Sequence, residues 1–240
     1  MNVDDAVDAL REVADPSRRP GMARVGIDVT NALGVSVPQI RRIAKRAGTD
    51  PPLAEALWNT GVHEARMLAT LVADAASLTR RQMDDWAADL DSWDVGDFAA
   101  DLFAATPHRD QTIVAWSARQ EPFVKRCAFA MIARRAVSDK DAPDAAFVAY
   151  LPLIRTGARD DRNDVKKGVS WALRQIGKRN TALGASAEDL ARSLVASDSP
   201  SARWIGRDAL RDLAAARRRN LLNLERAGNR KERREHKEGE

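Results

Sequence analysis

The sequence has very few of the residues from which metal and disulfide sites are built. Cys127 is the only cysteine in the 240-residue chain, and the three histidines, His63, His108 and His236, lie far apart. A single cysteine excludes an intramolecular disulfide and a CxxC metal motif. Because a zinc site needs several His, Cys or carboxylate ligands close together, we expect no metal and no cofactor.

Aromatic residues and long apolar runs are also scarce. Phe, Trp and Tyr make up 5% of the chain, whereas alanine is abundant and the hydrophobic fraction is 44%. This composition favours packed helices over sheets. No run approaches the ~20 apolar residues that a membrane span requires. The N-terminus, MNVDDAVDALREVAD, is acidic and amphipathic, unlike a secretion signal, so we expect a cytoplasmic protein.

The chain lacks a general excess of positive charge. Its net charge is +4, but residues 217–240 alone carry nine Lys or Arg and five Asp or Glu, so the rest is neutral. Within the neutral part the charges are segregated. Residues 155–179 hold eight basic and three acidic side chains, whereas residues 84–101 hold seven aspartates and no cation. Any surface that binds an anionic partner is therefore indicated by where the charges cluster along the chain, and not by the net charge.

Helix signals recur along the chain. Ser36 is a predicted N-cap with Pro38 in the first turn, and Thr79 with Gln82 has the spacing of a capping box. Residues 22–34 lack a clean period and predict a loop with a short helical turn. No alternating strand pattern occurs. The predicted helices are 2–14, 35–47, 50–59, 62–74, 79–90, 95–104, 107–118, 122–137, 143–156, 162–178, 186–196 and 200–214.

The predicted fold class is all-α, a right-handed α-α superhelix of HEAT-like repeats. Helices of this length recur in pairs every ~40–47 residues, the period of HEAT or armadillo repeats. A globular helix bundle is the alternative. We expect one solenoid domain over residues 1–216. The mixed-charge segment 217–240 has few apolar residues after Leu224, and we expect it to be disordered or only transiently helical.

The stretch 164–180, DVKKGVSWALRQIGKRN, has an unusual polar face. As a helix it puts Val165, Val169, Ala172, Leu173 and Ile176 on one apolar stripe. Opposite that stripe lie Lys167, Trp171, Arg174 and Lys178. A tryptophan among cations is either covered by a neighbouring helix or partner, or belongs to a surface that binds an anion with a flat part, such as nucleic acid.

Two further groups of residues stand out. In DSWDVGDFAAD, Trp93 and Asp97 are one helical turn apart and lie opposite the core stripe, although Trp93 could precede the helix. Asp94 fits the role of a helix N-terminal acid. In the nearly all-apolar PFVKRCAFAMIARRAV, Arg126 needs a partner, which is either a protein carboxylate or a ligand anion such as phosphate.

No Ser-His-Asp order, P-loop or HExxH motif occurs, so ordinary nucleophilic or metal-dependent hydrolysis has no support. The sequence does resemble the AlkD-like family of DNA alkylation repair proteins, which are built from HEAT-like repeats. The resemblance covers about residues 20–214 and is most specific in SWDVGD and VSWALR. Other matching segments are GIDVTNALGVSVPQIRRIAK, GVHEARMLATLVAD, EPFVKRCAFAMIARRAV and ASDSPSARWIGRDAL.

This resemblance implies a DNA glycosylase that excises positively charged N3- or N7-alkylated purines from duplex DNA without flipping the base. It implies that Asp97 is the catalytic residue, that Trp93 and Trp171 lie beside the lesion, and that Arg126 contacts a phosphate. Arg174 matches a further basic position, and the helical wheel adds Lys167 as a DNA contact. A monomer in the cytosol or nucleoid is expected.

Two other functions stay open from the sequence. The same residues could hold damaged or branched DNA without catalysis, because some relatives keep the fold and show little activity. The helical array could instead be a protein–protein scaffold, with its tryptophans at the interface. Affinity for duplex DNA that falls steeply as salt rises is expected of the two DNA-binding functions and not of the scaffold.

Overall fold

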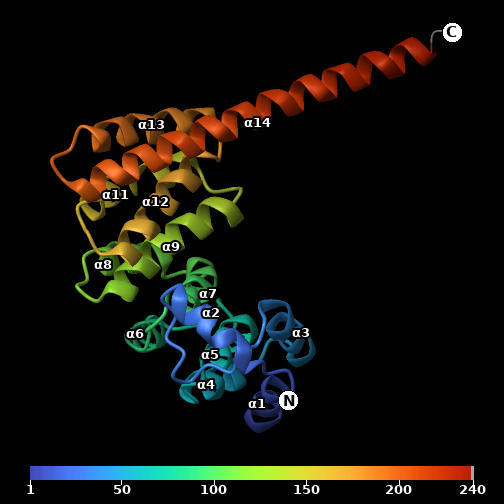
Figure 1. Ribbon diagram of the computed structural model, residues 1–240, viewed down its shortest axis with the longest axis vertical. Helices are drawn as coiled ribbons and strands as arrows, with labels where there is room; N and C mark the ends of the chain where they lie inside the picture. The colour runs from blue at the N-terminus through green and yellow to red at the C-terminus, as the bar shows by residue number, and fades with distance from the viewer. Residues whose placement is uncertain (239–240) are drawn as a thin grey trace.

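The computed structural model describes the backbone of residues 1–238 and the side chains of residues 1–219. Throughout that range the regular elements are helices (Figure 1). They are α1 (Val3–Glu12), the 3-10 turn η1 (Pro16–Arg18), α2 (Arg19–Arg24), α3 (Val37–Ala47), α4 (Pro51–Asn59), α5 (His63–Val72), α6 (Arg80–Ala88), α7 (Trp93–Ala104), α8 (Arg109–Ser117), α9 (Pro122–Ser138), α10 (Asp144–Val148), α11 (Leu151–Gly157), α12 (Asn163–Gly177), α13 (Thr181–Val195) and α14 (Pro200–Glu238). None of the described helices is long and apolar enough to cross a membrane.

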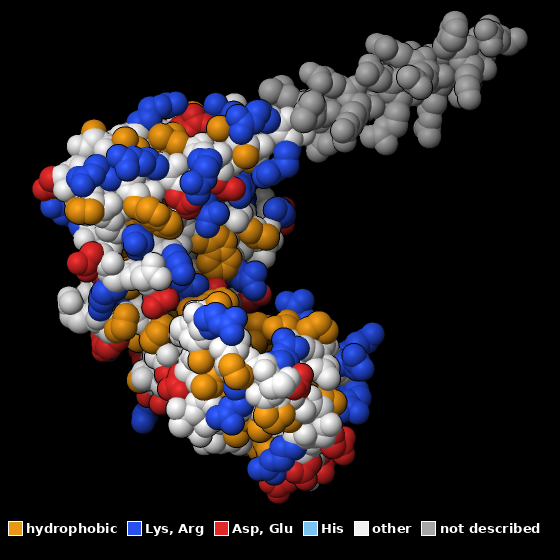
Figure 2. Space-filling model, viewed as in Figure 1, with side chains coloured by type: hydrophobic (Ala, Val, Ile, Leu, Met, Phe, Trp, Pro, Cys, Tyr) orange, Lys and Arg blue, Asp and Glu red, His pale blue; other side chains and the backbone are white. Residues whose placement is uncertain are grey.

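The helices form two curved layers. In the inner layer, α3, α5, α7, α9, α12 and α14 pack on one another in that order, and α4, α6, α8, α11 and α13 lie behind them. Figure 1 shows the inner layer on the concave side of a C-shaped molecule, with α1 and α3 at one end and α13 and α14 at the other. The space-filling view is hollowed on the same side (Figure 2). The predicted all-α array of stacked helix pairs is confirmed.

Most helix boundaries follow the predicted caps. Ser36 and Gln39 form one capping box, and Thr79 and Gln82 form another. Two predicted helices were wrong in detail. The helix predicted at 143–156 is two, α10 and α11, since Pro152 has no N–H to continue the ladder. The helix predicted from 186 begins at Thr181, because the Asn180 side chain accepts a hydrogen bond from Leu183 N at 2.9 Å.

Residues 217–240 were predicted to be disordered or transiently helical. α14 continues through Glu238, and Figure 1 shows it projecting past the helix pairs. The side chains after Arg219 lie outside the described residues. The domain boundary at residue 216 and the behaviour of the tail stay predictions.

Tryptophans of the outer helices hold successive repeats in register. The rings of Trp58 on α4 and Trp86 on α6 stack with their centroids 4.3 Å apart. Trp58 Nε1 donates to Asp89 at 3.0 Å, and Trp86 Nε1 donates to Glu55 at 3.2 Å. Each buried ring therefore satisfies its one polar atom on the neighbouring repeat.

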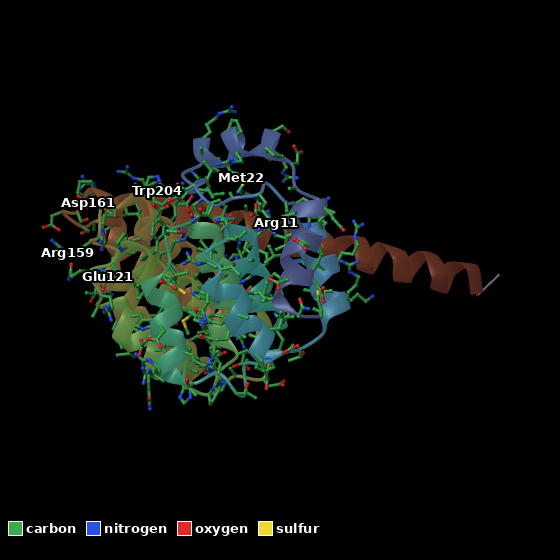
Figure 3. The ribbon with its side chains drawn as sticks, turned by 90° about the horizontal axis from the view of Figure 1, so that it is seen from below. Arg11, Met22, Glu121, Arg159, Asp161 and Trp204 are labelled. Atoms are coloured by element: carbon green, nitrogen blue, oxygen red, sulfur yellow. The ribbon has the colours of Figure 1, made fainter. Side chains whose placement is uncertain are left out.

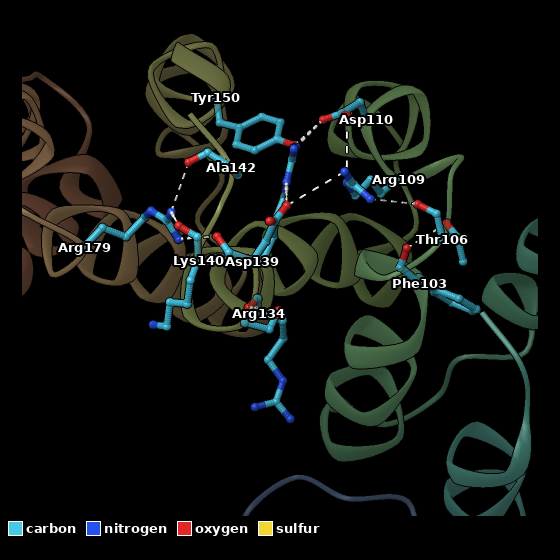
Figure 4. A network of polar contacts seen from close by, with 12 residues as sticks. Phe103, Thr106, Arg109, Asp110, Arg134, Asp139, Lys140, Ala142, Tyr150 and Arg179 are labelled. Carbon is cyan, nitrogen blue, oxygen red and sulfur yellow. Dashed lines mark hydrogen bonds and ion pairs between the residues drawn. The ribbon is translucent and has the colours of Figure 1, made fainter. Parts of the chain in front are cut away.

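A polar network fixes the C-terminal half of α9 (Figure 4). Buried Arg135 donates to Asp110 of α8 at 2.6 Å, to Asp139 at 3.2 Å and to the Tyr150 hydroxyl. Arg179, just after α12, donates to main-chain carbonyls of Ala136, Asp139, Lys140 and Ala142. α9 is thereby tied to α8, to the turn before α11 and to the end of α12.

A buried carboxylate anchors the loop between α2 and α3 to α5. Glu64 is 1% exposed and accepts hydrogen bonds from the backbone N–H groups of Leu33, Gly34 and Val35 at 2.8, 2.7 and 3.1 Å. Gly34 has φ +82°, and a Cβ there would lie 2.1 Å from the carbonyl oxygen of Asp15. Only glycine fits this position, so the path of the loop is set by Glu64 and Gly34 together.

We expect Glu64→Gln to lower the free energy of unfolding by about 1–3 kcal/mol, because an amide presents one acceptor and turns its NH2 group toward donors. Urea denaturation measures the change. Asp8→Asn is the control, since Asp8 forms an exposed ion pair with Arg11 on α1, and a surface substitution of this kind stays within about 0.5 kcal/mol. Equal loss in both variants would show that Glu64 does not anchor the loop.

Candidate functional site

Three consecutive inner helices, α7, α9 and α12, carry the residues singled out from the sequence. α7 begins at Trp93 directly after Ser92, whose buried hydroxyl accepts a hydrogen bond from Asp28 N at 3.0 Å. Trp93 is therefore the first residue of the helix, and Asp97 follows one turn later on the same side. α9 packs between α7 and α12. This order brings Trp93, Asp97, Arg126 and Trp171 into neighbouring positions of one layer.

Asp97 and Arg126 form an ion pair at the centre of this region. Arg126 Nη2 lies 3.0 Å from Asp97 Oδ1 and 2.9 Å from Oδ2. Arg126 Nη1 donates to the carbonyl oxygen of Asp164 on α12 at 3.0 Å. Arg126 is 6% exposed, whereas the side chain of Asp97 is 21% exposed. Of the two partners considered for Arg126, the protein carboxylate is present, and the carboxylate is Asp97.

Burial and the ion pair act on Asp97 in opposite directions. Loss of solvent raises the pKa of Asp97 above its ordinary value, and the charge and hydrogen bonds of Arg126 hold that rise in check. Burial also raises the pKa of the neighbouring Cys127 thiol, whose Sγ lies 3.6 Å from the Gly96 carbonyl oxygen. The thiol is thus protonated at neutral pH and is a poor nucleophile.

The arrangement repeats along the same helices. The Arg126 guanidinium lies 5.7 Å from the ring centroid of Trp93, and the Arg134 guanidinium lies 5.7 Å from that of Trp171. Arg134, two turns after Arg126 on α9, pairs with Asp101, one turn after Asp97 on α7. Two sets of tryptophan, arginine and aspartate therefore lie side by side. The first set is Trp93, Arg126 and Asp97, and the second is Trp171, Arg134 and Asp101.

Both tryptophans are half-buried and partly covered by these guanidinium groups. Trp93 Nε1 donates to the carbonyl oxygen of Val25 at 3.1 Å, so the loop anchored by Glu64 also holds the Trp93 ring. On the other side, a Cβ at Gly168 would lie 3.3 Å from Arg126 Cγ, which shows how closely α12 approaches α9. The absence of a side chain there leaves room for the arginine.

The two further predicted DNA contacts differ in their surroundings. Lys167 is exposed on α12. Arg174 is 3.5 Å from Asp208 and 3.9 Å from Asp212, both on α14. Asp208 also accepts from Ser170 Oγ at 2.7 Å. Arg174 is thus shared between α12 and α14, and only part of its charge is available to an outside anion.

Several neighbours of the site were missed by the sequence reasoning. Asp101 and Arg134 are only weakly indicated by the sequence. Asp101 lies one helical turn after the predicted site residue Asp97, and Arg134 lies two turns after Arg126. Asp94 was interpreted as a helix N-terminal acid. It does lie in the first turn of α7, but it also pairs with buried His63 at 3.0 Å. The partner lies 31 residues away in the sequence, so no local pattern indicates it.

The geometry suits a reacting group that becomes positively charged. A carboxylate of reduced exposure shares its arginine with the face of Trp93, and Trp171 lies beside the next ion pair along the same helices. Aromatic rings and carboxylates both attract cations. Among the described residues no group of three His, Cys, Asp or Glu side chains could hold a metal ion.

The chain is similar to known proteins in sequence and in fold. The family model described as DNA alkylation repair enzyme matches residues 6–213. No curated protein matches the chain. A solved structure from a family of proteins related to the HEAT-like repeat DNA glycosylases, with affinity for branched DNA structures, superposes with a TM-score of 0.72. It is 16% identical, and the match covers 80% of this chain and 83% of that one.

Two artificial proteins are more distantly similar. An engineered protein has a TM-score of 0.41 at 15% identity, with 86% of this chain and 97% of that chain covered. A designed armadillo repeat protein has a TM-score of 0.38 at 15% identity, with coverages of 86% and 98%. Neither adds to the fold assignment. The family match, in contrast, spans most of the chain, and the chain belongs to the DNA alkylation repair enzyme family.

Proposed function

We propose that this protein is a DNA glycosylase that excises positively charged N3- or N7-alkylated purines from duplex DNA. The observation that carries the proposal is the Asp97 carboxylate, held by Arg126 beside Trp93 on the inner layer of a HEAT-like array. Membership of the alkylation repair family supports DNA as the substrate. The catalytic role of Asp97 is part of the proposal.

The chemistry needs few groups because the lesion itself supplies the leaving group. Alkylation at N3 or N7 makes the purine cationic and weakens its bond to C1′. When that bond breaks, its electron pair goes to the purine, which leaves as a neutral base, and C1′ becomes an oxocarbenium ion. A water oxygen then adds to C1′ and loses a proton, giving an abasic site. No acid is needed to protonate the base.

Asp97 stabilises the sugar cation and orients the water. Electrostatic stabilisation of this kind is strongest in a site that is partly shielded from solvent. Arg126 is required because it keeps the half-shielded carboxylate ionised and fixes its direction. The faces of Trp93 and Trp171 each add about 0.5–2 kcal/mol of attraction for a cationic base or sugar. The carboxylate is reached from the open inner surface, which fits excision without flipping the base.

Phosphate contacts on both sides of the lesion position the duplex without reading its sequence. Lys167 is suited to this role by its exposure, and Arg174 by its place between α12 and α14. Arg126 can reach a phosphate only by exchanging a hydrogen bond that it makes within the protein. Its expected phosphate contact is therefore a rearrangement on DNA binding.

A second function has one specific observation in its favour. The protein with the similar fold is described as having affinity for branched DNA. A binder of this kind would use the same inner layer and release no base. Analysis of the bases released from methylated duplex distinguishes the two functions directly, since 7-methylguanine or 3-methyladenine appears only if the protein is a glycosylase.

For Asp97→Asn we expect the single-turnover rate of 7-methylguanine release to fall ~10²-fold or more, as for other lost electrostatic groups. The affinity for methylated duplex should stay equal or improve, because a carboxylate near phosphates is repulsive in the ground state. Such a loss in rate alone marks an interaction made in the transition state. Asp101→Asn, one turn away, should cost at most a few-fold. Normal excision by Asp97→Asn would falsify the mechanism.

The pH dependence tests the role of Arg126. The active form of Asp97 is the carboxylate, so the excision rate is lost as pH falls through the pKa of Asp97, which burial raises. Arg126→Ala removes the opposing charge and should move this acidic limb to higher pH. If Arg126 also contacts a phosphate, the log–log salt slope of duplex binding becomes shallower by about one. An unchanged pH limb would contradict the ion pair's role in catalysis.

A further inference from the structure

One tryptophan is used neither by the core nor by the proposed reaction site. Trp58, Trp86 and Trp116 are buried, and Trp93 and Trp171 are half-buried beside the ion pairs. Trp204, in the second turn of α14, is 40% exposed. It is the most exposed tryptophan of the chain, so part of its ring is left free for a stacking partner.

Trp204 begins an exposed stripe of basic residues. At 100° per residue, Trp204, Arg207, Arg211 and Arg218 lie within an arc of about 60° on α14, and all four are exposed. The opposite side of the helix buries Ile205, Ala209 and Leu213 against the core. We call these four residues the α14 stripe. It presents one flat apolar surface followed by three guanidinium groups, of which that of Arg211 is paired with Asp208.

The stripe continues onto the neighbouring inner helix. Lys166 of α12 places its Nζ 5.0 Å from the ring centroid of Trp204. Asp208 and Asp212 flank the stripe. Asp208 pairs with Arg174 of α12 and with Arg211 of the stripe itself, and Asp212 pairs with Lys178 at the end of α12. Their charge is thus largely neutralised within the protein. The outward charge of this part of α14 and α12 is positive.

The figures place this surface on an accessible side of the molecule. Trp204 lies at the edge, on the same side as Met22 of α2 (Figure 3). In the space-filling view, Lys and Arg side chains gather over the α13–α14 end with hydrophobic side chains among them (Figure 2). α14 packs directly on α12, the helix that carries Trp171.

We propose that the α14 stripe binds single-stranded DNA, with an unpaired base stacked on Trp204 and backbone phosphates on Arg207, Arg218 and Lys166. Proteins that bind single strands without sequence preference combine a basic track with aromatic stacking platforms. In a duplex the base faces are covered by their neighbours, so an exposed indole has no partner there. The proposal goes beyond base excision and does not depend on it.

The test measures the affinity of the full chain for a fluorescein-labelled oligo-dT strand by anisotropy. Trp204→Ala should weaken binding ~5- to 150-fold, the loss expected for 1–3 kcal/mol of stacking per base. Trp204→Phe should retain most of the affinity, since it keeps an aromatic face. Arg207→Ala and Arg218→Ala should each reduce the log–log salt slope by about 0.7.

Matched controls lie on helices other than α12 and α14. Arg81→Ala removes an exposed cation of α6 and Val148→Ala an exposed apolar side chain of α10, and both should bind oligo-dT as the wild type does. A melting curve of each variant confirms folding. Trp204→Ala should excise bases from fully paired methylated duplex as the wild type does. A loss of base release and a loss of oligo-dT binding are therefore separate results, and each tests its own proposal.

Two outcomes overturn the proposal. The first is oligo-dT binding by Trp204→Ala as tight as that of the wild type. The second is competition by a polyglutamate of equal charge as effective as that of unlabelled oligo-dT, which would assign the stripe to acidic proteins instead.

Discussion

The ion pair between Asp97 and Arg126 is the interaction on which the site depends. A carboxylate that is mostly removed from water is held ionised only by a fixed opposite charge. Arg126 supplies that charge from α9 and is itself fixed by the Asp164 carbonyl of α12. Three successive inner helices are therefore joined at one guanidinium group. Removing either partner leaves the other charge uncompensated, so the ion pair supports both the site and the packing of these three helices.

α9 is positioned by contacts at both of its ends. Near its beginning, Arg126 lies between α7 and α12, and near its end Arg135 is held by Asp110 and Asp139. The stacked tryptophans of the outer layer keep the repeats behind it in register. A site made of one carboxylate and two aromatic faces needs such rigidity, because small displacements of a catalytic group cost large factors in rate.

Local sequence patterns predicted most of the fold and only part of the site. Proline, caps and apolar periodicity sufficed for the helix pairs, and the helical wheel correctly put Trp171 apart from the apolar stripe of α12. The wrong elements were those decided by one residue, Pro152 in the helix predicted at 143–156 and Asn180 before α13. The partners of Arg126, Arg134 and Arg174 could not be predicted, since each lies 29 to 38 residues away and depends on how helices stack.

The proposed mechanism requires Asp97 and the two tryptophan faces to be complementary to a cationic sugar. Enzymes bind transition-state analogues far more tightly than substrates. The most direct measurement compares the affinity of the wild-type protein for two duplexes, one with a positively charged pyrrolidine at the abasic position and one with neutral tetrahydrofuran. We expect the cationic analogue to bind about 10²-fold more tightly, which is the lower end of the preference of enzymes for transition-state analogues. Equal affinity for the two duplexes would contradict it.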